Sequence, residues 1–358
     1  MQRVMDLDTP VMVVDLDQVE DNIQRLQADL NRLGLANRPH IKTHKIPTIG
    51  RWQQQAGAIG ITCQKLGEAE VFADNGFQDI LVPYNIMGAP KLERLTRLAR
   101  RGVTVTVAVD SEYTARGIAG AAQEADTSLR MVVEVDSGGH RAGVQNAKEA
   151  QTLARIIADF PNVEFQGFMC YPSRPAMTEI WEEARDLLSK DGIPIHMISG
   201  GGTGAQEVSK ANGATEHRSG TYLYNDLSCY RGGKATLDQC AMTILTTVVS
   251  TSCPGFSIVD GGSKTFTNDA LQREGSNGYV REYPDVYLER MNEEHGVLSL
   301  SKLPEGAPRP KVGEKVHVIP NHACGTTNLH DVVYGYRKRN GEEVVEWEWP
   351  IHARGKIR

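Results

Sequence analysis

The strongest constraint on the fold is an alternation of short β-rich runs with amphipathic helical stretches, which continues to about residue 200. Such alternation predicts parallel strands joined by helical crossovers. The β-rich runs contain many Val and Ile residues, as strands buried on both faces do. The predicted strands are 11–15, 40–42, 57–63, 79–85, 103–110, 129–136, 163–171 and 195–199, and amphipathic helices are predicted over 18–33, 91–100 and 147–159.

Eight strand–helix units predict an α/β fold of the (β/α)8 barrel type. A doubly wound open sheet is the competing layout, but the count and even spacing of the units favour the barrel. After about residue 235 the β-rich runs are separated by turn residues, without predicted helices between them, which indicates an antiparallel β domain. These runs are 240–253, 256–264, 296–301, 314–320, 331–337 and 342–350. We therefore expect a barrel over 10–235, and a β domain over 236–358 that includes residues 1–9 and carries the metal ligands considered below.

Composition excludes several classes of protein. With 358 residues, of which 40% are apolar and 23% charged, the chain can bury a large core. The net charge is −6 and no Lys/Arg cluster dominates a segment, so no nucleic-acid partner is expected. No apolar run approaches the roughly 18 residues that span a bilayer, and the N-terminus lacks the apolar region of a signal peptide. The six cysteines are scattered without a CxxC pair, so we expect reduced thiols, a cytoplasmic location and no membrane association.

Lys42 lies in the basic segment RPHIKTHK (38–45), which ends a predicted barrel strand. Barrel enzymes carry their functional residues at the carboxyl ends of the strands. A partly desolvated lysine in such a place can form a Schiff base with an aldehyde. A basic loop that holds phosphate, or that is simply solvated, would show the same spacing.

Three consecutive glycines follow another predicted strand, in the segment SGGGTG that runs from Ser199 to Gly204. The backbone N–H groups of such a turn can converge on an anion, and Thr203 adds a hydroxyl. Barrel enzymes often hold phosphate after their last strands, which favours a phosphate site in this segment over a tight turn alone.

Two arginines stand among small residues, where a guanidinium can approach a cofactor closely. Arg141 follows the predicted strand 129–136, and an ion pair with Asp136 is its structural alternative. Arg218 precedes a small Ser-Gly-Thr run that contains Gly220 and Thr221, which suits an anion or a heteroaromatic nitrogen. An arginine against a pyridine nitrogen would keep that nitrogen unprotonated, whereas the structural alternative is a polar loop between the domains.

His322 and Cys324 follow the predicted strand 314–320. Positions i and i+2 of a strand face the same side, so the pair can bind one divalent ion, and imidazole with thiolate suits Zn²⁺. Two protein ligands leave room for water or substrate; a half-buried cysteine beside a loop histidine is the structural alternative. Gln64 and Tyr171 end two other predicted strands and can line the barrel mouth, where Tyr171 can stack on a ring.

In this order, the motifs resemble the D-threonine aldolase and D-serine dehydratase family, which belongs to the alanine-racemase-like (fold type III) pyridoxal 5'-phosphate (PLP) enzymes. The resemblance covers nearly the whole chain, and its most specific pieces are RPHIKTHK, EVDSGGHRAG, SGGGTG, HRSGTYLYND and PNHACGTTNLHD. It implies that Lys42 forms the Schiff base with PLP and that Arg141 and Arg218 lie against the cofactor ring. It also implies a metal pair, His322 and Cys324, that holds Zn or Mn next to PLP. It further implies a phosphate cup made of Gly201, Gly202, Thr203, Gly220 and Thr221. We also expect Gln64, Tyr171 and Ser199 to bind the cofactor.

The family acts on D-amino acids that carry a β-hydroxyl and is usually dimeric, so a homodimer is expected. Residues 60–65 (GITCQK) look more like the aldolases, whereas the His/Cys metal pair looks more like the dehydratases. We expect PLP- and metal-dependent retro-aldol cleavage of D-3-hydroxy amino acids to glycine and an aldehyde, with His44 as a candidate base. The alternatives are a D-serine or D-3-hydroxyaspartate dehydratase that yields a 2-oxo acid and ammonia, an amino-acid racemase, and a non-catalytic PLP-binding protein, which the β domain disfavours.

Overall fold

The structure, a computed structural model, describes residues 2–269 and 277–358, which divide into two compact units. The barrel unit consists of Arg25–Lys42, Pro47–Gly220 and Lys356–Arg358. The β unit consists of residues up to Gln24, Thr43–Ile46 and Thr221–Gly355. The domain bounds expected from the sequence stay predictions. Among the described helices, none combines the length and apolar character that a membrane span needs.

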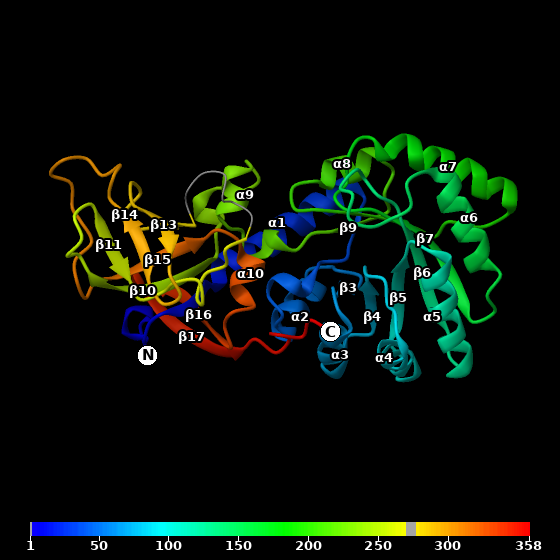
Figure 1. Cartoon of the computed structure of the whole chain (residues 1–358), viewed down its shortest axis with the longest axis horizontal. Coiled ribbons are helices and arrows are strands. Elements are labelled where there is room, and N and C mark those ends of the chain that lie inside the picture. The colour runs from blue at the N-terminus through cyan, green and yellow to red at the C-terminus, as the bar shows by residue number, and fades with distance from the viewer. Residues whose placement is uncertain (1, 270–276) are drawn as a thin grey trace. The chain divides into compact units, whose positions relative to one another are not determined.

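The barrel unit is built on a parallel sheet of 8 strands in the order β2-β9-β8-β7-β6-β5-β4-β3 (Figure 1). An isolated parallel bridge between His40 and Thr62 connects the two edges of this sheet, so the strands form a closed ring. This confirms the predicted barrel. The strands are β2 (Ala36–Asn37), β3 (Ile61–Thr62), β4 (Asp79–Val82), β5 (Thr104–Val109), β6 (Leu129–Glu134), β7 (Val163–Met169), β8 (Met197–Gly201) and β9 (Glu216–Arg218).

Helices follow the barrel strands along the chain, and α4 to α7 cover the outside of β4 to β7 (Figure 1). Leu81, Ala108, Val132 and Met169, which come from four neighbouring strands, form one buried cluster. The burial of apolar side chains between strands and helices is the main stabilising contribution to such a layered fold. The helices are α1 (Leu16–Leu33), which runs from one unit into the other, α2 (Pro47–Gln55), α3 (Leu66–Asp74), α4 (Ala89–Arg100), α5 (Glu112–Glu124), α6 (Ala147–Ala158), α7 (Met177–Asp191) and α8 (Gln206–Ala211).

The prediction of residues 11–15 as a barrel strand is wrong. This segment is β1 (Val11–Asp15), which pairs with β10 (Met242–Ser250) and β16 (Val332–Arg339) in the β unit. Its place in the barrel is taken by β9, which pairs in parallel with both β8 and β2. The local pattern Val-Met-Val-Val predicts a buried strand correctly, but it does not specify which sheet supplies the hydrogen-bonding partners.

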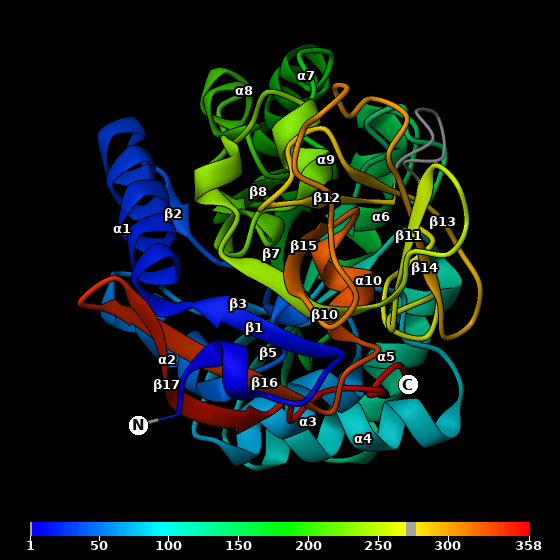
Figure 2. The ribbon, with the colours of Figure 1, turned by 90° about the vertical axis from the view of Figure 1, so that its left-hand side faces the viewer.

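The β unit contains a ring of antiparallel strands, because β10 pairs with β11 as well as with β15. β1 lies between β10 and β16, and β17 pairs with β16, which extends the sheet beyond the ring; Figure 2 shows β1, β16 and β17 side by side. The prediction of an antiparallel β domain is therefore confirmed. The remaining strands are β11 (Phe256–Val259), β12 (Gly278–Val280), β13 (Tyr287–Met291), β14 (Gly296–Ser299), β15 (Lys315–Pro320) and β17 (Glu342–Pro350).

Two features of the β unit differ from the sequence prediction. β12 and β13 were not predicted, and the expected absence of helix after residue 235 is wrong, because α10 (Ala323–Thr327) follows β15. A further short helix, α9 (Leu227–Arg231), precedes β10. These helices have only 5 residues each and are too short to show an amphipathic repeat in the sequence.

A buried charged cluster lies on β15. The His317 side chain is 1% exposed, and its ring nitrogens lie 2.7 Å from Glu282 Oε1 and 3.2 Å from Glu343 Oε2. Burial lowers the pKa of His317, but hydrogen bonds with the two carboxylates raise it overall. Burial raises the pKa of Glu343, but the contacts with His317 and Arg281 together outweigh it and lower this pKa to about 2.

Candidate functional site

The carboxyl ends of the barrel strands bring most of the predicted cofactor residues to one rim. Gln64 follows β3, Tyr171 follows β7, Gly202 follows β8 and Gly220 follows β9. Parallel strands in a ring end on the same side, so these residues surround one mouth of the barrel unit. Lys42 lies beyond the His40 bridge, in a 3-10 turn over Ile41–Thr43, so the predicted strand 40–42 ends earlier than expected.

Lys42 is half-buried, and its amine lies over an aromatic ring. Its Nζ lies 5.9 Å from the centroid of the Tyr171 ring, and Cζ of Arg141 lies 4.9 Å from the same centroid. Within residues 2–269 and 277–358, no carboxylate comes within ion-pair distance of Lys42. An amine that no acid partner holds is available for condensation with an aldehyde.

The turn that carries Lys42 is linked to Gln64 through a histidine. Nε2 of His40 lies 3.0 Å from Oε1 of Gln64, and the backbone N–H of Lys42 points at Nδ1 of His40 over 3.4 Å. Because Nδ1 accepts the backbone proton, the ring proton of neutral His40 belongs on Nε2, from which it donates to Gln64. The turn that carries Lys42 and the side chain of Gln64 are therefore connected through His40.

Arg141 is carried by a loop that Asp136 organises. The Asp136 carboxylate accepts backbone hydrogen bonds from Gly138, Gly139 and His140 at 2.9–3.1 Å. The ion-pair partner of Arg141 is Glu134, at 3.6 Å, rather than Asp136. Burial raises the pKa of Glu134, and the positive charges of Arg141 and Arg218 offset part of this increase.

Arg218 is almost completely buried and is held rigidly by its neighbours. Nη1 donates to the carbonyl and hydroxyl of Ser199, and Nη2 donates to the carbonyl of Cys170 at 2.8 Å. The hydroxyl of Ser199 donates in turn to Glu216 at 2.5 Å, and Glu216 also accepts from Nε of Arg38 at 2.9 Å. Nε of Arg218 takes part in none of these bonds, which leaves this donor for a ligand.

The glycine turn after β8 has close backbone neighbours. A Cβ on Gly201 would lie 3.2 Å from the carbonyl oxygen of Arg218 and 3.4 Å from Cδ2 of Tyr171. Gly202 has φ of +111°, a conformation that side-chain-bearing residues rarely adopt. The N–H groups of Gly201 and Gly202 already donate within the protein, to Ser173 Oγ and to the Arg218 carbonyl, both at 3.0 Å. In the described part of the chain, the N–H groups of Thr203 and Gly204 have no such acceptor. These two groups are therefore better placed to bind an anion than those of Gly201 and Gly202.

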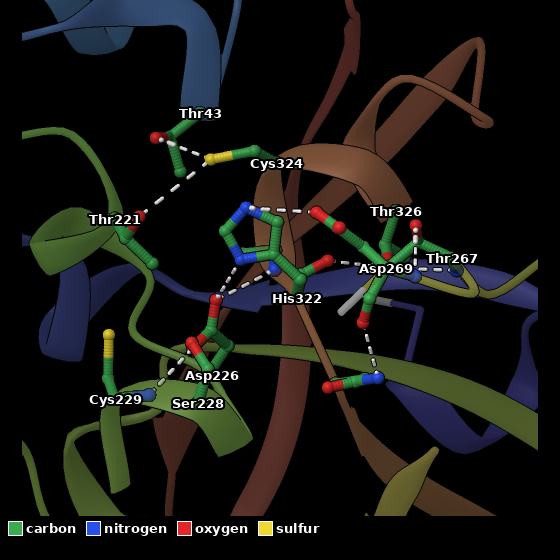
Figure 3. A network of polar contacts seen from close by, with 12 residues as sticks. Thr43, Thr221, Asp226, Ser228, Cys229, Thr267, Asp269, His322, Cys324 and Thr326 are labelled. Atoms are coloured by element: carbon green, nitrogen blue, oxygen red, sulfur yellow. Dashed lines mark hydrogen bonds and ion pairs between the residues drawn. The ribbon is translucent and has the colours of Figure 1, made fainter. Parts of the chain in front are cut away.

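The predicted metal ligands lie together in the β unit, at the start of α10 (Figure 3). His322 precedes the helix and Cys324 lies in its first turn, so the premise of a continuing strand is wrong. Nδ1 of His322 lies 3.0 Å from Oδ2 of Asp226, and Nε2 lies 3.8 Å from Oδ2 of Asp269. Burial lowers the pKa of His322, but hydrogen bonds with Asp226 and Cys324 outweigh it and raise the pKa to about 10.

Two threonine hydroxyl groups lie near Sγ of Cys324, as Figure 3 shows. It lies 3.1 Å from Oγ1 of Thr43, the residue after Lys42, and 3.8 Å from Oγ1 of Thr221. Among the described residues, no group of three or more His, Cys, Asp or Glu side chains has the arrangement of a metal site. An imidazole and a thiol are both groups that Zn²⁺ accepts as ligands, and a pair of protein ligands would leave coordination positions open.

His44, the candidate base, is fully buried in the β unit. Its Nδ1 lies 3.1 Å from both the N–H and the carbonyl oxygen of Ile46, so it helps to hold the backbone around the turn 43–46. Sequence reasoning missed Glu216 and Asp226, both of which carry several of the contacts above. Asp226 ends the motif HRSGTYLYND, and an acidic residue that ends a polar motif was the available signal.

Comparison with known proteins covers nearly the whole chain. Residues 14–228 match the family model for the N-terminal domain of alanine racemase, and residues 241–336 match the model for a serine dehydratase domain. The chain is 33% identical to 3-hydroxy-D-aspartate aldolase of Paracoccus denitrificans (strain Pd 1222), over 98% of this chain and 93% of the relative. It is 31% identical to D-threo-3-hydroxyaspartate dehydratase of Delftia sp. (strain HT23), over 90% of this chain and 92% of the relative.

The crystal structure of D-threonine aldolase from Filomicrobium marinum superposes with a TM-score of 0.88 at 30% identity, and all of both chains is covered. The two matching domain models, the relatives and the fold agree with the motifs found in the sequence. The chain therefore belongs to the D-threonine aldolase and D-serine dehydratase family, a family of lyases among the alanine-racemase-like, fold type III PLP enzymes.

Proposed function

We propose that the protein cleaves D-3-hydroxy amino acids by a retro-aldol reaction to glycine and an aldehyde, with PLP and a divalent metal as cofactors. The observation that carries the proposal is the amine of the half-buried Lys42 at the barrel rim, near Tyr171 and without a carboxylate partner among the described residues; Arg141 lies over the same ring. The similarity to a 3-hydroxy-D-aspartate aldolase and a D-threonine aldolase supports the same reaction and substrate class.

The residues at the barrel rim fit PLP. When bound, this cofactor supplies an electron sink for the electrons released at Cα of the substrate. The Lys42 amine would hold the cofactor covalently, and Tyr171 and Arg141 would border its ring. The Nε of Arg218 would donate to the ring nitrogen and keep it unprotonated, because a guanidinium does not give up its proton. The N–H groups of Thr203 and Gly204 would donate to the phosphate.

The residues at the start of α10 fit Zn²⁺ or Mn²⁺. His322 would hold the ion through Nε2, because Nδ1 is occupied by Asp226, and Cys324 would hold it through a thiolate. The ion would supply Lewis acidity toward the β-hydroxyl of the substrate. His44 stays a prediction for the base; its full burial and its contacts with Ile46 favour a role in holding the backbone near Lys42.

Dehydration is the second candidate, because Cys324 as a metal ligand resembles the dehydratases and the Delftia relative is a dehydratase. The test is incubation of the purified protein, loaded with PLP and Zn²⁺ or Mn²⁺, with D-threonine, D-phenylserine and D-serine. We expect glycine and the matching aldehyde, and no product from Lys42→Ala. Ammonia and a 2-oxo acid without glycine would reject the aldolase proposal in favour of the dehydratase. Racemisation that survives exhaustive chelation would reject both.

We also propose that the enzyme is a homodimer, as the family resemblance implies. Light scattering of the purified protein tests this, and a mass near the 39.3 kDa of one chain would contradict it.

A further inference from the structure

Asp226 has a buried carboxylate whose two oxygens face different elements. Its side chain is 0% exposed. Oδ1 accepts from the hydroxyl of Ser228 at 2.5 Å and from the N–H of Cys229 at 2.9 Å, and thereby caps α9. Oδ2 lies 3.0 Å from Nδ1 of His322 and accepts from the N–H of Ala323 at 2.9 Å. One carboxylate therefore joins the first turns of α9 and α10 (Figure 3).

We propose that Asp226 is the positioning residue of the metal site, because its Oδ2 fixes the ring of His322 with Nε2 directed at the ion. The inference rests on the proposed role of His322 as a metal ligand. A metal-bound histidine commonly donates its second ring N–H to a carboxylate, which sets the tautomer and the ring orientation. The Oδ2–Nδ1 contact is of that kind, and the Ala323 N–H holds Oδ2 in place for it.

Because Oδ1 and Oδ2 of Asp226 contact different helices, an isosteric replacement of this residue can separate the two roles. In Asp226→Asn, the amide oxygen can stay on the α9 side and keep the cap made with Ser228 and Cys229. The amide NH₂ then faces two donors, Nδ1–H of His322 and N–H of Ala323, and cannot accept from either. The substitution therefore preserves the cap of α9 while it removes the contact that orients His322.

Ser228→Ala is the matched control, because it removes a hydrogen bond from Oδ1 and leaves the Oδ2 contacts intact. The PLP-loaded protein, stripped of metal, would be titrated with Zn²⁺ in competition with a chromophoric chelator. Loss of such outer carboxylates typically weakens metal binding about 10–100-fold, which we expect for Asp226→Asn, while Ser228→Ala stays near wild type. His322→Ala should lose saturable Zn²⁺ binding.

Replacement of Zn²⁺ by Co²⁺ distinguishes a lost orientation of the His322 ring from a general disruption of the metal site. At saturating Co²⁺, Asp226→Asn should retain the thiolate-to-cobalt absorption of Cys324, because only the histidine loses its orienting partner. Loss of that absorption together with a large drop in thermal midpoint would assign Asp226 a structural role and overturn the inference. Unchanged Zn²⁺ affinity in Asp226→Asn would overturn it and leave the metal site standing. Wild-type protein that binds no more Zn²⁺ than His322→Ala would overturn both the inference and the proposed metal dependence.

Discussion

Glu216→Gln removes the carboxylate that connects Arg38 to Ser199 and Arg218 inside the barrel unit. The side chains of Glu216 and Arg38 are 3% and 8% exposed, and Nε of Arg38 donates to Glu216 over 2.9 Å. Burial lowers the pKa of Arg38, but Glu216 and Asp79 raise it overall, so this guanidinium depends on its acidic neighbours. Arg218, the most deeply buried guanidinium of the site, also has Glu216 as a counter-charge.

Removal of one partner from a buried ion pair typically costs about 3–5 kcal/mol, because the remaining charge is left uncompensated. Gln keeps the shape of the side chain and can still accept from Ser199, and Asp79 remains beside Arg38. We therefore expect a loss at the lower end, about 3 kcal/mol. For a unit of this size that corresponds to a decrease in thermal midpoint of roughly 6–12 °C.

The assay is urea unfolding followed by the fluorescence of the protein, in which Trp181 of α7 is a buried reporter in the barrel unit. Glu207→Gln is the control, because Glu207 is 65% exposed and pairs with the exposed Arg32. Exposed pairs contribute little to stability, so no measurable change is expected there. If Glu216→Gln were no more destabilising than Glu207→Gln, the buried pair would not have the role assigned to it.

Three further predictions concern the proposed cofactor, the metal and pH. Lys42→Ala should lack the borohydride-sensitive absorbance at roughly 410–420 nm that a PLP Schiff base gives, and persistence of that band would contradict the assignment. His322→Ala should lose bound metal in elemental analysis, whereas the exposed His352→Ala should keep it. The raised pKa of His317 stabilises the fold fully below pH 6.5 and loses this effect as pH rises through the raised value. The lowered pKa of Glu343 stabilises the fold above pH 4.5, and this effect is lost as pH falls toward about 2. The thermal midpoint should therefore depend less on pH in His317→Gln than in the wild type. A pH profile of the thermal midpoint that is the same in both proteins would refute the prediction.

Local patterns in the sequence were sufficient for the class of fold. Helix predictions over 18–33, 91–100 and 147–159 agree with α1, α4 and α6 to within a few residues, because their apolar repeats are long. Sheet membership is harder to predict: the apolar pattern of 11–15 predicts a strand correctly, but it does not indicate that this strand belongs to the β unit. Hydrogen-bonding partners of a strand are set by distant segments, and the strand's own residues do not encode them.

The sequence motifs nominate the candidate residues, whose roles stay predictions, but they do not indicate the contacts between them. The sequence pointed to Lys42, Arg218 and the His322/Cys324 pair, which the structure sets at strand or helix ends. It did not show that Asp226 would contact His322, because 96 positions separate them in the chain. Such contacts arise only when the fold brings remote segments together. The expected strand geometry at Cys324 failed because a short helix starts there instead.

The central position of β1 in the β unit has a consequence for synthesis on the ribosome. β1 is made before the strands of the barrel, yet its neighbours β10 and β16 are made more than two hundred residues later. The barrel can pair all its strands before then, because they end at Arg218. During elongation the N-terminal strand therefore remains an unpaired edge that can associate with other chains. A gene fragment that begins after residue 24 would lack β1, a strand from the middle of the sheet. Such a truncation should therefore destabilise the β unit more than the barrel unit.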